Sequence, residues 1–336
     1  MLSPDLRQRA TVALASPDAA QQLEALLSAG NPFGKSWYVD SVNGSDGNDG
    51  RSPASPLASF DGSNGLFARS ATQPDPIHFT SWDDVYVVND IRAQVTAPLG
   101  VYGVRIIGAA AGQGRNATEG GAAVDGNGVS WREESTAANA PLLELRQQGW
   151  EVHNILFTPQ STYSAIKLNR QETATYPDAS HFVARNCRFT QAASVGSGVE
   201  DYGGAHNVLL DGCEFDGLEF GWEQSNVSIA SPLRVRIRRC RFRENKHDIV
   251  MNGSKCVIGG RPDEGNFFET VYHGTTHPNT VNMAYTASVG SNMVFNNYFA
   301  DAAADVTIAK GYKPGTSDIW RNHVSNTAAY IVTVPA

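Results

Sequence analysis

The sequence has few charged residues, no long apolar run and little cysteine. Asp, Glu, Lys and Arg make up 18% of its 336 residues, against about 25% in an average globular chain. No apolar run approaches the roughly 18 residues of a membrane span, and residues 1–18 have charges and prolines where a secretory signal has an apolar core. We therefore expect a soluble protein made in the cytoplasm, whose four cysteines are buried thiols and not disulfides.

The sequence also lacks the positive charge that nucleic-acid binding needs. Its formal net charge is −8, which argues against contact between the whole protein and a phosphate backbone. Glycine is abundant instead, with 32 residues, and short apolar segments alternate with runs of Gly, Asn, Ser and Asp. This texture is typical of an all-β protein with many turns and not of a helical bundle.

The first 33 residues form a separate segment with two helix-start signals. In Ser3-Pro4-Asp5 and again in Ser16-Pro17-Asp18, serine fits the N-cap, proline the first helical position and aspartate the positive helix end. The two predicted helices are too short to form a core alone, so they must dock on something. Residues 1–33 either cap the following domain or attach the protein to a larger assembly, and both interpretations stay open.

From Trp37 onward the sequence predicts β-structure. A strand at 37–39 is followed by residues 40–50, which are so rich in Asn, Asp and Gly that they predict tight turns. We favour a structural loop there, and calcium binding stays open although the spacing does not match an EF-hand. Residues 109–140, rich in Gly and Ala, are interpreted as a long loop.

A repeated pattern predicts how these strands are organised. Six segments place a phenylalanine after a short apolar strand and a small or polar turn, at intervals of 26–32 residues. Periods of this length indicate stacked structural units. A second short strand follows most of the anchors, which is typical of one coil of a solenoid. The anchors are Phe157, Phe189, Phe215, Phe242, Phe268 and Phe299.

The predicted fold class is an all-β, right-handed, single-stranded parallel β-helix. It spans residues 34–336, with regular coils from about 141 to 336 and residues 1–33 as the helical segment before it. Cys187, Cys213 and Cys240 occupy the same position in three consecutive repeats. Because coils stack about 4.8 Å apart, we expect these thiols to form an inward column, as small hydrophobic side chains in a narrow core.

Acidic residues in the second strands suggest a catalytic site. Glycoside hydrolysis needs two carboxyl groups about 5–9.5 Å apart, and equivalent outward positions on neighbouring coils offer such spacings. Alignment of these strands predicts Glu200, Glu219 and Asp248 on the outer face of adjacent coils, as acid and as base or nucleophile. Substrate-binding residues are expected beside them: Asp201, Tyr202, Trp222 and Glu223. The alternative is that these acids only solvate an exposed β face.

A basic stripe lies in another strand. In the run from Arg234 to Arg243, alternation turns Val235 and Ile237 inward and the arginines outward. Arg236 and Arg238 are predicted to contact an acidic polysaccharide, since arginine pairs well with carboxylates. A solvated strand surface or a salt-bridge seam between subunits is the alternative.

Two of these motifs resemble a known family. The run from Trp37 to Gly50 with Ser52-Pro53 and Pro56-Leu57, and the Asn-Cys-Arg-Phe turn at 186–189, resemble pectate-lyase-like β-helix proteins, including bacteriophage tailspikes. The resemblance covers roughly residues 37–336. It implies a homotrimer on a virion with a carbohydrate partner. The fold hosts several activities, and the pectate-lyase catalytic signature is absent.

The sequence thus predicts a phage virion spike or fibre that binds host cell-surface polysaccharide. Whether it also depolymerises that polysaccharide is open, and a glycoside hydrolase fits better than a lyase. The alternatives are a non-enzymatic head or tail fibre and a bacterial β-helix polysaccharide lyase or hydrolase. We expect contact with other virion proteins through residues 1–33, and no cofactor, metal, nucleic acid or membrane insertion.

Overall fold

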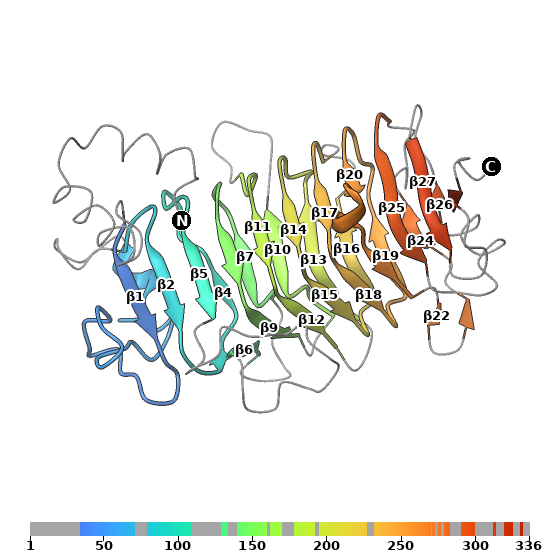
Figure 1. Ribbon diagram of the computed structural model, residues 1–336. Coiled ribbons are helices and arrows are strands. Elements are labelled where there is room, and N and C mark those ends of the chain that lie inside the picture. The colour runs from blue at the N-terminus through green and yellow to red at the C-terminus, as the bar shows by residue number, and fades with distance from the viewer. Residues whose placement is uncertain are drawn as a thin grey trace, which may run out of the picture.

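The computed structural model shows a stack of parallel β-coils, with successive coils adding along one axis (Figure 1). Its described residues are 34–70, 79–108, 129–133, 140–159, 162–169, 178–191, 195–226, 232–269, 271–272, 275–276, 279–282, 290–299, 312–313, 319–324 and 330–331. Strands pair in parallel with the equivalent strand of the next coil, so the chain is a parallel β-helix, as the sequence predicts.

The strands form three parallel ladders, two of which join in an 18-stranded sheet. The first ladder runs through β1 (Ser36–Val39), β2 (Asp84–Val87), β5 (Arg105–Gly108), β8 (Glu151–His153), β11 (Val183–Arg185), β14 (Leu209–Asp211), β17 (Arg236–Arg238), β20 (Val257–Gly259), β25 (Met293–Phe299) and β27 (Ile319–Val324). The second runs through β3 (Ile91–Arg92), β6 (Val129–Arg132), β9 (Ile155–Thr158), β12 (Arg188–Thr190), β15 (Glu214–Asp216), β18 (Arg241–Arg243) and β21 (Phe267–Phe268), and ends on β25.

The third ladder is a separate 8-stranded sheet. It consists of β4 (Val95–Thr96), β7 (Leu143–Leu145), β10 (Ile166–Asn169), β13 (Ser197–Tyr202), β16 (Phe220–Gln224), β19 (His247–Val250), β24 (Asn279–Asn282) and β26 (Tyr312–Lys313). The remaining elements are the antiparallel pair β22 (Val271–Tyr272) and β23 (Thr275–Thr276), β28 (Tyr330–Ile331) antiparallel to β27, and the 3₁₀ turns η1 (Phe67–Ser70) and η2 (Pro262–Glu264).

A column of stacked aromatic rings fills the interior. The six phenylalanine anchors stack on one another with ring centroids 4.8–5.2 Å apart, close to the strand spacing, which confirms the predicted repeat. Trp131 stacks on Phe157 at 5.7 Å and Phe60 stacks on Trp131 at 5.1 Å, so the column continues toward the N-terminus. These rings are fully buried, and parallel stacking of large apolar groups is the main stabilising contact between coils.

Polar turns close the coils beside this column. Cys187, Cys213 and Cys240 are buried at one position of successive coils, as predicted. In later coils asparagine takes over: the Asn266, Asn297 and Asn322 side chains are buried, and Asn266 Nδ2 and Asn297 Nδ2 each donate to the next Oδ1, at 2.9 and 2.8 Å. These hydrogen bonds between asparagine side chains satisfy polar groups that are buried at the turns.

The N-terminal half differs in part from the sequence interpretation. The first ladder begins at β1, well before the predicted regular coils, and β6 lies within the stretch interpreted as a long loop. In the 40–50 loop, Asp40 accepts hydrogen bonds from the backbone N–H groups of Val42 and Asn43. That carboxylate therefore holds a turn. Residues 1–33 lie outside the described residues, and no helix in the described part is long and apolar enough to cross a membrane.

Candidate active site on the 8-stranded sheet

Two glutamates lie side by side on the outer face of the 8-stranded sheet. Glu200 of β13 pairs in register with Glu223 of β16, and Lys167 of β10 is the partner of Glu200 on the other side. Neighbouring parallel strands lie about 4.8 Å apart, so the two carboxylates start from adjacent backbone positions. We call Glu200 and Glu223 the glutamate pair.

Glu200 is held in place by three side chains. Its Oε1 accepts a hydrogen bond from Ser225 Oγ at 2.6 Å, and its Oε2 accepts one from Ser164 Oγ at 2.9 Å. Lys167 Nζ lies 3.5 Å from Oε1. Two hydroxyl groups and one ammonium group thus contact this carboxylate.

Glu223 has a different environment. Burial is the main influence and raises the pKa of Glu223 above its ordinary value; a hydrogen bond from Ser197 opposes it, and the charges of Glu200 and Glu219 raise the pKa further. Ser197 Oγ donates to Glu223 Oε2 at 2.5 Å. Two adjacent carboxyl groups with unlike environments are the arrangement that separates a general acid from an ionised partner.

Polar side chains extend this face over β4, β7 and β10. Lys167 Nζ lies 4.4 Å from the centre of the Tyr202 ring, which is half-buried at the end of β13. Glu144 continues the column beyond Lys167 and accepts a hydrogen bond from Asn169 Nδ2 at 2.6 Å. Arg146 lies 3.3 Å from the same carboxylate. The glutamate pair therefore lies at one end of a polar track.

The structure corrects three outward placements. Asp201, Trp222 and Asp248 are all 0% exposed and point into the coil, so none lies on the outer face. The alternation of inward and outward side chains is interrupted in β16. A Cβ at Gly221 would lie 2.8 Å from the Phe242 ring, so this position also faces inward. Two consecutive inward residues, Gly221 and Trp222, shift the faces of everything that follows in β16.

The expected alignment of Glu219 with Asp248 is also wrong. Phe220 pairs with His247, which places Glu219 beside Lys246, two residues from the expected partner. Lys246 Nζ lies 2.9 Å from Glu219 Oε1. Glu219 thus faces outward and forms an ion pair with Lys246, and its charge contributes to the raised pKa of Glu223.

Asp248 is a buried carboxyl group of the interior. Asn245 Nδ2 donates to its Oδ1 at 2.9 Å, while its Oδ2 has no hydrogen-bond partner among the residues that the structure describes. Burial raises its pKa well above the ordinary value, which favours the protonated acid.

Arg236 and Arg238 lie on β17 of the other sheet, away from the glutamate pair. Arg236 Nη2 lies 3.0 Å from Glu264 Oε2, and Arg238 bridges Glu264 at 2.5 Å and Asp211 at 3.0 Å. These acids belong to neighbouring coils of the same chain. The stripe therefore forms an intramolecular salt-bridge ladder, and the structure does not bring it together with the predicted acids.

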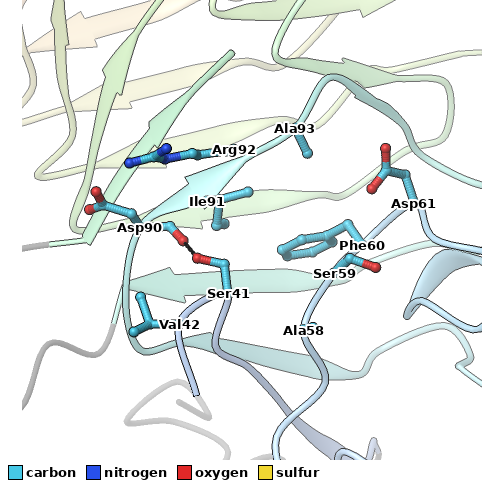
Figure 2. Close-up of a pocket in the computed structure, with 10 residues that line it drawn as sticks. All are labelled: Ser41, Val42, Ala58, Ser59, Phe60, Asp61, Asp90, Ile91, Arg92 and Ala93. Carbon is cyan, nitrogen blue, oxygen red and sulfur yellow. Dashed lines mark hydrogen bonds between the residues drawn. The ribbon is translucent and has the colours of Figure 1, made fainter. Parts of the chain in front are cut away.

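A pocket of about 340 Å³ lies elsewhere, between the 41–61 loop and β3 (Figure 2). Asp61, Asp90 and Arg92 lie among its lining residues. Asp90 is engaged by Ser130 Oγ at 2.7 Å and by Arg132 at 3.1 Å, and Phe60 in the wall is fully buried. Figure 2 shows Asp61 and Asp90 on opposite sides of the pocket, so its described lining holds no pair of adjacent carboxyl groups. Among the described residues, no cluster of His, Cys, Asp and Glu is arranged for a metal ion.

Sequence reasoning missed the side chains that distinguish the two glutamates. Each of these side chains belongs to the coil before the glutamate that it contacts. They are Lys167 and Ser164 for Glu200, and Ser197 for Glu223. The available signal was a shared position in the coil: Ser164 precedes Glu200 by one coil and 36 residues, and Ser197 precedes Glu223 by one coil and 26 residues. Such a signal becomes visible only after the register is known.

No protein-family model matches the sequence, and no curated protein matches it. Among solved structures, the native GH136 lacto-N-biosidase from Eubacterium ramulus is similar with 11% identity and a TM-score of 0.49, over 87% of this chain and 57% of that chain. A rhamnogalacturonan lyase is similar with 12% identity and a TM-score of 0.32, over 87% of each chain. The chain thus spans little more than half of the lacto-N-biosidase.

Proposed function

We propose that this protein binds a polysaccharide on the outer face of its 8-stranded sheet and hydrolyses glycosidic bonds at the glutamate pair. One observation carries the proposal: Glu200 and Glu223 are in register on adjacent coils, and their surroundings differ. Retaining glycosidases hold two carboxyl groups about 5–5.5 Å apart, close to the strand spacing of about 4.8 Å.

The environments assign the roles. Glu223, whose pKa is raised, donates its proton to the glycosidic oxygen as that bond breaks. Glu200, which Lys167 and two serines hold in place, attacks the anomeric carbon as a carboxylate and forms a glycosyl ester. Glu223, now a carboxylate, then removes a proton from water, whose oxygen displaces Glu200 and restores both groups.

The remaining predicted site residues take other roles. Tyr202 lies on the polar track with Glu144, which the sequence did not single out, and both contact sugar units beyond the cleaved bond. Glu219 raises the pKa of Glu223 through its charge. Asp201, Trp222 and Asp248, being buried, act through the packing beneath the site. Arg236 and Arg238 are assigned to the stability of the other face.

The biological setting is proposed from the sequence resemblance. We propose a homotrimer on a phage virion, attached through residues 1–33 and directed at a host surface polysaccharide. Light scattering of the purified protein tests the trimer, since a 36 kDa particle contradicts it. Deletion of residues 1–32 tests attachment: a folded trimer that no longer joins particles supports it, and normal incorporation contradicts it.

The deciding experiment measures reducing ends released from a panel of purified bacterial surface polysaccharides. We expect the wild type to release them from its cognate glycan, and Glu200→Gln and Glu223→Gln to abolish release while the glycan still binds. Binding without release by the wild type would favour a non-enzymatic fibre. Full activity in either variant would contradict the assignment.

A further inference from the structure

A second feature runs along the turns that precede the first ladder, above the strands labelled β2, β5, β11 and β14 (Figure 1). One residue per coil there has a left-handed backbone, with φ between 55° and 77°. These residues are Trp82, Gly103, Gly149, His181, Asn207, Arg234, Lys255 and Ser291. We call this column the turn ridge.

Backbone hydrogen bonds make the turn ridge continuous. From Trp82 to Lys255, the N–H of each member donates to the carbonyl of the residue before the next member, at 2.7–3.4 Å. Trp82 to Tyr102 and His181 to His206 are examples. The ridge is therefore a regular line of positions with the spacing of the coils, about 4.8 Å. Residues on it are fixed relative to one another.

The residue types on the turn ridge are not those that the backbone favours. Gly and Asn adopt positive φ most readily, and they occupy three of the eight positions. Trp82, Arg234 and Lys255 hold the same conformation against the preference of their side chains, and all three are exposed. All three side chains keep much of their surface in water, so a role in binding accounts for them better than a role in folding.

One end of the turn ridge is an aromatic platform. Trp82 is 58% exposed and Tyr102, which accepts its N–H bond, is 43% exposed. A Cβ at Gly103 would lie 2.3 Å from the Trp82 ring, so the ring lies against the backbone of the next coil. One face of the indole is thereby supported. A flat, supported and exposed indole is suited to stacking on the apolar face of a sugar ring.

The other end is cationic. Arg234 and Lys255 are exposed on adjacent coils and form no ion pair within the described residues, in contrast to the arginines of β17 and β18. Asp178, the acid near the middle of the ridge, accepts a hydrogen bond from Gln148 Nε2 at 2.7 Å. In a chain of net charge −8, two adjacent exposed cations with no ion pair among the described residues have the chemistry to bind carboxylate groups.

We propose that the turn ridge is a second glycan-binding site, which takes an extended acidic polysaccharide. Arg234 lies five coils from Trp82, about 24 Å at roughly 4.8 Å per coil, which is enough for about five sugar units. The chain stacks on Trp82 at one end, and its carboxylates pair with Arg234 and Lys255 at the other. This site lies at the turns and is independent of hydrolysis at the glutamate pair.

The backbone offers variants that remove side chains and still fold. Trp82→Gly and the double change Arg234→Asn with Lys255→Asn place residues that favour positive φ at positions that require it. We expect their melting temperatures to equal or exceed that of the parent protein. Ser291→Gly, at an exposed position of the same column without ring or charge, is the matched control.

The test measures binding to immobilised polygalacturonate, hyaluronan and polysialic acid, with neutral dextran as reference. A Glu223→Gln background prevents hydrolysis from interfering. We expect binding of at least one acidic polymer, weakened about tenfold by Trp82→Gly and by the double variant, since aromatic and arginine contacts dominate such interfaces. Binding by the double variant should also depend much less on salt concentration than binding by the parent. Ser291→Gly should bind like the parent.

Three outcomes would overturn the proposal: no binding to any acidic polymer, equal binding by the ridge variants, or preferred binding of the oligonucleotide dT30. None of them bears on hydrolysis, which the glutamate variants test separately. Conversely, the wild type could hydrolyse no glycan while the ridge variants lose binding to an acidic polymer. That result would support the turn ridge as a binding site and contradict the proposed hydrolysis.

Discussion

The two outer faces of the coil both bear charged residues, but their charges are neutralised to different degrees. On β17 and β18, arginines face acids of neighbouring coils, as in the contacts of Arg238 with Asp211 and Glu264. On β13 and β16, Glu200 and Glu223 are adjacent, and Lys167 is the cation beside them. Balanced charges stabilise the stacking of coils, whereas adjacent like charges raise a pKa. The difference separates a stabilising face from the one on which we propose that hydrolysis takes place.

Removing one acid from each face breaks this comparison most strongly. We expect Glu223→Gln to lower hydrolysis about 100- to 10,000-fold, the usual contribution of a general acid, with little effect on unfolding. Glu264→Gln should leave hydrolysis unchanged but reduce stability by about 1–3 kcal/mol, because two arginines and the Arg261 N–H bond this carboxylate. Reducing-end assays and urea unfolding of both variants measure the contrast. Equal loss of activity in both would remove the distinction between the faces.

The interior was predictable from the sequence because its chemistry repeats at one position. A phenylalanine must meet a phenylalanine one coil later, so the anchors from Phe157 to Phe299 mark the stack directly. Cys187, Cys213 and Cys240 mark a second column in the same way. Both columns are kept although the coils differ in length, because the extra residues of the longer coils lie in the connecting loops.

The site could be predicted only in part, because it depends on register. Phe215 to Phe242 and Gly221 to Asp248 are both 27 residues apart, but Phe189 to Phe215 is 26 and Val199 to Trp222 is 23. A loop of different length in each coil thus decides which acids are neighbours. The sequence predicts both Glu200 and Glu223 as site residues, but not their pairing in register.

The inner and outer faces of β21 offer a matched pair of aromatic residues. Phe268 stacks between Phe242 and Phe299 in the interior, while Phe267 stacks on Tyr298 outside. We expect Phe268→Ala to destabilise the protein by about 3–5 kcal/mol through a cavity in the stack. Phe267→Ala should cost about 1 kcal/mol, the contribution of an exposed aromatic pair. Denaturant unfolding measures both, and equal losses would mean that the inner stack does not dominate stability.

Buried Asp248 differs from the outward glutamates in how it responds to pH. Its raised pKa means that the folded protein holds a proton more tightly than the unfolded chain. Its contribution to stability is therefore complete below the unfolded value of about 4 and is lost as pH rises toward the folded pKa, by up to about 1.4 kcal/mol per pH unit.

Asp248→Asn keeps the shape of the neutral acid but cannot ionise. We expect the variant to lose less stability than the wild type between about pH 4 and 8, with the curves closest at the acidic end. Urea unfolding at several pH values gives both curves. Parallel curves would show that Asp248 does not titrate differently on folding.

The smallest effect is expected at the rim of the neutralised face. Arg241 lies 3.2 Å from Glu269, and both side chains are accessible to water, at 48% and 27% exposure. Since exposed ion pairs contribute about 0–1 kcal/mol, Arg241→Met should change the free energy of unfolding by less than about 1 kcal/mol, and less still in 0.5 M salt. Arg239→Met is the control, because its partner Asp211 is only 5% exposed and would retain Arg238 as its one remaining cation. The free energy of unfolding should fall further in this variant and depend less on salt, since water cannot solvate a buried carboxylate in place of the lost arginine. If Arg241→Met is the more harmful change, burial does not rank the ion pairs of this face.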